Sequence, residues 1–185
     1  MSAAVLLHVR RDEPRFRWRL VLGAGLALTL IHTLALPVLA LGEFTPDLFT
    51  LVALYVGLYA HRQGRYWPSL VLGLMRDFAS LGLLGSYAVL YSLLHKFAGR
   101  VRLRLDPDRV AIAMLLAFTG VFLVNFGYHF MLALSGAGVG WSAGLWRCLT
   151  TAAVTAPFTV PVFPLLHWGL AAIGMRRIQG GYWGF

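Results

Sequence analysis

Arg76 and Asp77 stand side by side in the hydrophobic stretch 66–94, and Asp77 is the only acid in that stretch. A charged side chain at bilayer depth costs about 3 kcal/mol or more, so one found there has a bonding partner or a chemical task. A lone intramembrane carboxylate suits two roles: a polar contact between helices, or a step on a proton or substrate path. The other polar residues in the apolar stretches decide between the two.

Asn125 and His129 are four residues apart, so they share one face of a helix, and Arg147 lies in the last apolar stretch. All three are candidate partners for Asp77. Arg76 points about 100° away from Asp77 around the helix and is left without an assigned partner. Because no second acid lies at depth, a proton relay has little support, and an interhelical polar clamp is favoured. The predicted clamp consists of Asp77, Arg76, Asn125, His129 and Arg147.

Motifs of known enzyme classes are missing from the sequence. It contains no GxSxG, no HExxH, no phosphate-binding loop and no dinucleotide fingerprint. The six His residues are scattered without metal-ligand spacing, and the single Cys148 excludes an intramolecular disulfide. We therefore expect a protein that is not an enzyme and that uses no cofactor and no metal.

The composition indicates a membrane protein. Of the 185 residues, 59% are hydrophobic and 12% are charged, and the mean hydropathy is +0.73. A soluble fold needs a more polar exterior than this. The net charge of +9 also suggests nucleic acid, but the charges form short blocks between apolar stretches, which is the pattern of membrane topology. Nucleic-acid binding is therefore not expected.

Six apolar stretches predict an all-α integral membrane protein with six transmembrane helices. A helix needs about 20 residues to cross the hydrocarbon, so the short second and fourth stretches predict tilted, broken or partly buried helices. The first stretch is longer than the apolar core of a signal peptide and is interpreted as an uncleaved helix. The predicted helices are residues 20–40, 48–60, 67–84, 86–97, 110–134 and 145–172.

The positive charges predict the orientation. Fourteen of the 16 Lys and Arg residues lie in the N-terminal leader, the C-terminal tail and the second and fourth connections. The other three connections hold none, and positive residues mark the cytoplasmic side. We predict one polytopic domain over residues 1–185, with a cytoplasmic basic leader (1–19), a six-helix bundle (20–172) and a cytoplasmic tail (173–185).

Helix-terminus signals support these ranges. The Thr-Pro-Asp sequence at 45–47 predicts an N-cap, a first helical residue and an acid that complements the helix dipole. The Asp-Pro-Asp sequence at 106–108 repeats this pattern, and Gly-Ser at 85–86 offers a weaker cap. Three prolines between 157 and 164 predict a kink or break in the last helix.

Two further patterns are candidates for contacts. The alternating segment 100–105 is interpreted as an extension of the fourth helix whose Arg side chains reach anionic headgroups, with a landing strip for a cytoplasmic protein as the alternative. Small residues four apart let helix backbones approach closely, although the motif is common by chance. The basic patch is Lys96, Arg100, Arg102 and Arg104, and the possible helix–helix interface is Gly23, Ala27, Gly140 and Gly144.

The order of the segments carries a resemblance. Pro-Asp-Leu at 46–48 opens one helix, Leu-Gly-Leu-Met-Arg-Asp-Phe at 72–78 ends the next, a glycine turn follows at 81–85, and the fourth helix runs into Gly-Arg at 99–100. With the closing segment 156–166, this pattern resembles the rod-shape-determining protein MreD family over about residues 44–166. The residues that match the family pattern are Pro46, Asp47, Gly73, Asp77, Gly85 and Gly99.

The resemblance implies a non-enzymatic scaffold of the bacterial elongation machinery in the cytoplasmic (inner) membrane. The implied partners are MreC, the SEDS polymerase with its class B penicillin-binding protein, the MreB filament and the lipid bilayer. The implied fold is that of the substrate-binding subunits of energy-coupling-factor vitamin transporters. Such a vitamin-binding subunit, with Gly23 and Ala27 as its docking face, is the alternative function, although the predicted outer side has little polar lining. A proton-coupled permease would need more acids.

Overall fold

The computed structural model describes residue 23 and residues 45–59, 66–80, 82–136 and 140–172. The elements in this part of the chain are all helical, as the sequence predicts. The basic leader, most of the first predicted helix including Ala27, and the tail lie outside the described residues. The helices are α3 (Leu48–Tyr59), α4 (Trp67–Ser80), α5 (Ser86–Arg102), α6 (Val110–Leu134), α7 (Trp141–Thr155), the 3-10 helix η3 (Ala156–Phe158) and α8 (Thr159–Ala172).

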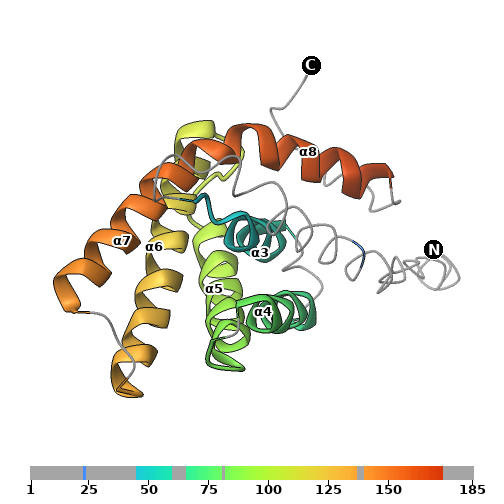
Figure 1. The fold of residues 1–185 in the computed structure, drawn as a ribbon. Helices are drawn as coiled ribbons and strands as arrows, with labels where there is room; N and C mark the ends of the chain where they lie inside the picture. The colour runs from blue at the N-terminus through green and yellow to red at the C-terminus, as the bar shows by residue number, and fades with distance from the viewer. Residues whose placement is uncertain (1–22, 24–44, 60–65, 81, 137–139, 173–185) are drawn as a thin grey trace, which may run out of the picture.

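Helix α3 is the centre of the described bundle. Helices α4, α5, α6 and α8 all pack against it, and Figure 1 shows it among them. Nine of its twelve residues are buried, and Phe49, Leu51, Leu54 and Leu58 are fully enclosed. A helix that is apolar around its whole circumference is stable when it is covered on all sides, and this position satisfies that requirement.

Helices α4 and α5 form a hairpin with an unusually close crossing. A Cβ placed on Gly73 would stand 2.4 Å from Cα of Ala88, so only glycine fits there. Helix α4 ends at Ser80, earlier than the predicted residue 84, and a turn follows in which Gly85 has a positive φ of 91°. Glycine adopts that backbone conformation without the steric cost that a side chain brings.

Helix α6 and the combined α7–α8 segment are the longest stretches of the described bundle. Helix α7 runs beside α6, and α8 continues across the top of the bundle in Figure 1. The predicted break is confirmed, because the 3-10 helix η3, which contains Pro157, separates α7 from α8. Within the described residues, two segments are long and apolar enough to cross a membrane, namely Val110–Leu134 and Trp141–Trp168, whereas α3 is apolar but shorter. The count of six spans stays a prediction.

Two of the predicted helix caps are wrong in their details. Asp47, and not Thr45, caps α3, because Oδ1 of Asp47 accepts the backbone N–H of Thr50 at 3.1 Å. Helix α6 has Arg109 at its N-cap with no side-chain hydrogen bond, and the 106–108 sequence does not cap it. Asp108 instead accepts the hydroxyl of Tyr59 at 2.9 Å, a bond that ties the start of α6 to the end of α3.

The predicted basic patch divides into exposed and inward-facing members. Helix α5 extends through Arg102, as the segment 100–105 predicts in part, and a turn follows. Lys96, Arg100 and Arg104 are exposed. Arg102 instead donates a hydrogen bond to the carbonyl oxygen of Leu58, and its guanidinium lies 5.0 Å from the ring centroid of Tyr59. This Arg joins two helices rather than extending freely to the surface.

Candidate functional site: the Asp47–Arg76 cluster

Asp47 is a buried carboxylate at the start of α3, with only 3% of its surface exposed. The Thr50 hydroxyl donates to Oδ2 at 2.7 Å, in addition to the backbone N–H of Thr50 at Oδ1. The side-chain amide of Asn125 on α6 donates to Oδ2 at 3.3 Å. The guanidinium of Arg76 on α4 forms an ion pair with Oδ1. Both oxygens of this carboxylate are therefore occupied by donors from three helices.

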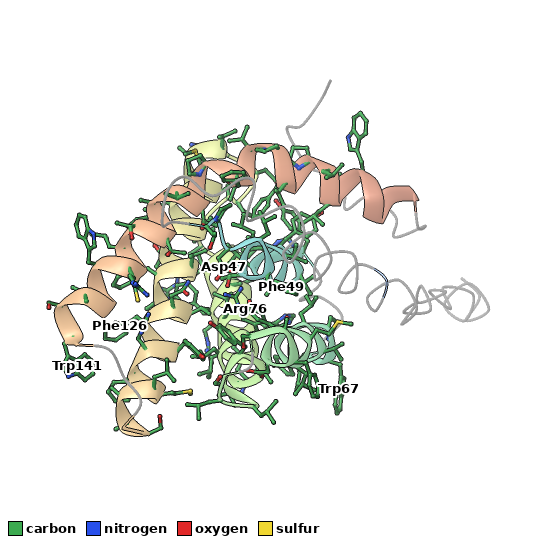
Figure 2. All side chains as sticks on the ribbon, in the orientation of Figure 1. Asp47, Phe49, Trp67, Arg76, Phe126 and Trp141 are labelled. Carbon is green, nitrogen blue, oxygen red and sulfur yellow. The ribbon has the colours of Figure 1, made fainter. Side chains whose placement is uncertain are left out.

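Arg76 is held by an aromatic frame as well as by the carboxylate. Its side chain is 13% exposed and also donates to the hydroxyl of Tyr91 at 3.2 Å. The guanidinium carbon lies 4.4 Å from the ring centroid of Tyr87 and 5.7 Å from that of Phe49, which are cation–π distances. Figure 2 shows Asp47, Phe49 and Arg76 grouped near α3, α4 and α5. Sequence analysis assigned no partner to Arg76, and the structure shows that its partners are the Asp47 carboxylate and the Tyr91 hydroxyl.

Two further bonds close the Asp47–Arg76 cluster. The Thr50 and Tyr91 hydroxyls lie 3.1 Å apart, and the backbone N–H of Asp47 donates to the hydroxyl of Thr155 on α7 at 2.9 Å. The cluster thus joins α3, α4, α5, α6 and α7. Its charges neutralise one another and its lone pairs are filled, so its chemistry is that of a structural junction and not that of an exposed acid or base.

Asp77 forms a second junction, between α4 and the start of α5. Its Oδ1 accepts the backbone N–H of Tyr87 at 3.0 Å and the hydroxyl of Ser86 at 3.2 Å. Its Oδ2 accepts the backbone N–H groups of Gly85 at 3.1 Å and Ala88 at 3.2 Å. A carboxylate from the preceding helix therefore caps α5, where a helix N-terminus favours negative charge.

The partners predicted for Asp77 differ from those observed. Among the described residues Asp77 bonds to the start of α5, and Asn125, His129 and Arg147 are not its partners. Asn125 bonds to Asp47 instead. The five residues of the predicted clamp thus separate into the Asp47–Arg76 cluster, the Asp77 cap and a third site that contains His129 and Arg147.

That third site is a cavity of about 340 Å³ between α6 and α7. The cavity adjoins the Asp47–Arg76 cluster, because Asn125 belongs to both. Gly144 lies near the cavity on α7, and a Cβ placed on it would stand 3.7 Å from Nδ1 of His129, an ordinary packing distance. The residues that line the cavity are Thr45, Asn125, His129, Arg147, Cys148 and Thr151.

Comparison with known proteins decides the family. The family model described as rod shape-determining protein MreD matches residues 14–168, which is most of the chain. The chain belongs to the MreD family. Neither a curated protein nor a solved structure matches it in the corresponding searches. It is therefore a rod-shape-determining protein of a membrane protein family, as the segment order predicts.

Five of the six residues singled out by the MreD resemblance gather at the end of the bundle where α3 begins and α4 meets α5. Asp47 carries the ion pair, Asp77 and Gly85 build the cap of α5, and Gly73 permits the close helix crossing. Pro46 is buried beside Asp47, whereas Gly99 is buried near the opposite end of α5. Of the small residues proposed as an interface, Gly23 and Gly140 have no heavy atom within 4 Å of an added Cβ.

Sequence analysis did not identify several residues that join the helices. Tyr87 and Tyr91 are four residues apart on α5, a spacing that places two aromatic side chains on one face, and this signal was available. Thr155 carried no comparable signal, because 108 residues separate it from Asp47. Ser69 and His95 were also missed: they are fully buried, with Oγ and Nδ1 2.9 Å apart, and they join α4 to α5.

Proposed function

We propose that this MreD-family chain is a non-enzymatic scaffold that binds MreC and supports the assembly or activation of the SEDS polymerase and its class B penicillin-binding protein. Peptidoglycan synthesis by this elongation machinery would take place on the far side of the membrane from the MreB filament. The observation that carries the proposal is the family match over residues 14–168. The internal neutralisation of the Asp47–Arg76 cluster supports a structural role for its charged groups.

The proposed topology is a six-helix bundle in the bacterial inner membrane, with both termini cytoplasmic and a fold like that of energy-coupling-factor substrate-binding subunits. The distribution of charge supports the orientation. The exposed Lys96, Arg100 and Arg104 lie toward the α5–α6 connection, whereas the Asp47–Arg76 cluster and the Asp77 cap lie at the opposite end of α5. By the positive-inside rule, these two junctions belong to the outer half of the bundle.

A scaffold acts through the position of its helices, and the junctions are suited to hold them. The Asp47–Arg76 cluster fixes α3 against α4, α5, α6 and α7, and the Asp77 cap fixes the α4–α5 turn. Both junctions are buried, so their hydrogen bonds are shielded from water. An anchor helix of MreC would then meet a surface whose shape is fixed from within.

Disulfide crosslinking with the MreC homologue tests this proposal. Single cysteines would be scanned along the first predicted helix (20–40), α6 and the α7–α8 segment in a Cys148→Ser background, against cysteines in the MreC anchor helix. We expect crosslinks at positions that recur every three to four residues on at least one helix, as one helix face requires. Co-purification should fall when that face carries large side chains. Absence of both crosslinks and co-purification would contradict the proposal.

A ligand screen serves as the control for the scaffold assignment. Thermal unfolding of the purified protein would be measured with a panel of vitamins. We expect no vitamin to shift the unfolding midpoint at nanomolar to micromolar concentration. A clear shift of that kind would contradict the scaffold proposal, because a ligand that binds the folded state alone raises the midpoint by mass action.

A further inference from the structure

The cavity between α6 and α7 holds a cation that is not neutralised by the described residues. Arg147 lines the cavity and is exposed. Each of the four acids in the described ranges is engaged elsewhere: Asp47 with Arg76, Asp77 at the start of α5, Asp106 with Arg109 and Asp108 with Tyr59. An arginine in an apolar membrane segment usually has a partner or a task, and no described acid supplies the partner.

The other polar groups of the cavity supply hydrogen-bond donors around Arg147. Thr45, Thr151 and His129 line the cavity, and no hydrogen bond among the described residues uses their hydroxyl or imidazole groups. The amide nitrogen of Asn125 already donates to Asp47 and to the Val121 carbonyl oxygen, so both of its hydrogens are used within the chain. The site therefore combines one cation with three groups able to donate a hydrogen bond.

In the membrane topology proposed above, the exposed apolar side chains around the cavity would contact the acyl region of a bilayer. On α7 the side chains next to Arg147 that face away from the bundle are Leu145, Trp146 and Leu149, and all three are exposed. Trp141, also exposed, begins the helix about 9 Å before Arg147 along its axis. Tryptophan concentrates at the membrane interface, and a long arginine side chain extends toward it. In that topology the cavity lies near the level at which a lipid headgroup and its acyl chains meet.

We propose that this cavity binds the phosphate of an anionic phospholipid, with Arg147 as the charge partner and His129, Thr45 and Thr151 as hydrogen-bond donors. A phosphate diester presents several acceptor oxygens to these groups, more than the two of a carboxylate. The volume of about 340 Å³ lies in the range of sites for small ligands, so it accommodates a headgroup and not a single water. The apolar face of α7 then contacts the acyl chains.

The test uses the full chain, stripped of lipid in detergent and titrated with phosphatidylglycerol under native mass spectrometry. Diacylglycerol, which lacks the phosphate, and inorganic phosphate, which lacks the acyl chains, are the two comparison ligands. We expect phosphatidylglycerol to bind at least about tenfold more tightly than either. Arg147→Gln should remove about tenfold or more of that affinity, since a charge-assisted hydrogen bond is lost.

Neighbouring threonines provide a matched pair of control variants. Thr151→Val removes a hydroxyl from the cavity and should weaken phosphatidylglycerol binding by about threefold. Thr150→Val should leave the affinity unchanged, because the Thr150 hydroxyl already donates to the carbonyl oxygens of Trp146 and Arg147 on its own helix. Thermal unfolding of each variant without lipid confirms that the fold is intact.

Three results would overturn the proposal. Undiminished phosphatidylglycerol binding by Arg147→Gln would exclude the cavity as the site. Equal binding of inorganic phosphate, or preferential binding of an acidic peptide, would show that the ligand is not a lipid. A loss of stability in Arg147→Gln that is the same with and without phosphatidylglycerol would show that Arg147 serves a bond within the chain. None of these readouts involves MreC, so the lipid site and the scaffold proposal fail separately.

Discussion

Separating the charges of the Asp47–Arg76 cluster should destabilise the protein far more than removing both together. Asp47→Asn leaves the Arg76 guanidinium, 13% exposed, inside the bundle without its anion. Arg76→Met leaves the Asp47 carboxylate, 3% exposed, without its cation. Breaking a buried pair from either side costs about 3 to 5 kcal/mol, because an uncompensated charge remains in a medium of low dielectric constant.

The double variant Asp47→Asn/Arg76→Met should recover part of this loss. It has no buried charge, and the asparagine still offers a side-chain oxygen to cap α3. We expect its free energy of unfolding to exceed the value predicted by adding the two single losses by roughly 2 to 3 kcal/mol. Reversible unfolding in lipid bicelles measures all four proteins under the same conditions.

The chain contains a matched control for this cycle. Asp106 and Arg109 form an ion pair at 4.0 Å whose side chains are 50% and 76% exposed. Exposed pairs contribute about 0 to 1 kcal/mol, so the cycle Asp106→Asn with Arg109→Met should show a coupling below about 1 kcal/mol. If the Asp47–Arg76 cycle were additive within about 0.5 kcal/mol, the ion pair would not be the interaction that stabilises this cluster, and the reasoning would be refuted.

Variants at three further positions, two of them with a matched comparison, test the remaining contacts by the same unfolding measurement. Gly73→Ala should cost about 1 to 3 kcal/mol of stability, because its Cβ would stand 2.4 Å from the backbone of Ala88. Gly140→Ala, which has open space around the added Cβ, should change stability by less than about 0.5 kcal/mol. Equal effects of the two substitutions would contradict the close α4–α5 crossing. Asp77→Leu should cost at least about 3 kcal/mol of stability and reduce MreC co-purification, whereas Asp77→Asn should cost less stability. Equal losses of stability in the two variants would exclude capping of α5 by the Asp77 carboxylate. Tyr59→Phe should cost about 1 kcal/mol through the lost bond to Asp108, and an unchanged stability would show that this bond contributes nothing.

The helices themselves were predictable, because each follows an apolar run bounded by proline, glycine or charge. The ends were less predictable. The cap of α3 is Asp47 rather than Thr45, through a bond to the backbone N–H of Thr50 in the same helix. Helix α5 extends to Arg102, whose guanidinium bonds to a carbonyl oxygen of another helix, α3. Local patterns state which residues favour a helix end, but they do not state which distant donor or acceptor will satisfy it.

Sequence analysis predicted which polar residues form buried contacts better than it predicted which of them pair with one another. Asp77, Arg76 and Asn125 all take part in buried junctions, as an apolar setting requires. Their partners were not deducible, because the ion pair joins residues 29 positions apart and depends on which faces of α3 and α4 meet. Helical periodicity fixes the angle between side chains on one helix and leaves the rotation of two helices relative to each other open.

That rotation is what the Asp47–Arg76 cluster specifies. Apolar contacts alone do not strongly select one rotation of a helix such as α3, because hydrophobic burial is not directional. Only one rotation brings Asp47 to Arg76 while Asn125 and Thr155 reach the same residue. Any other leaves a buried charge unpaired, at a cost of several kcal/mol. A pair that adds little net stability thus excludes the competing arrangements of α3. If MreC binds a surface whose shape depends on the rotation of α3, the double variant Asp47→Asn/Arg76→Met should unfold less readily than either single variant. The same double variant should bind MreC less well than the wild type does.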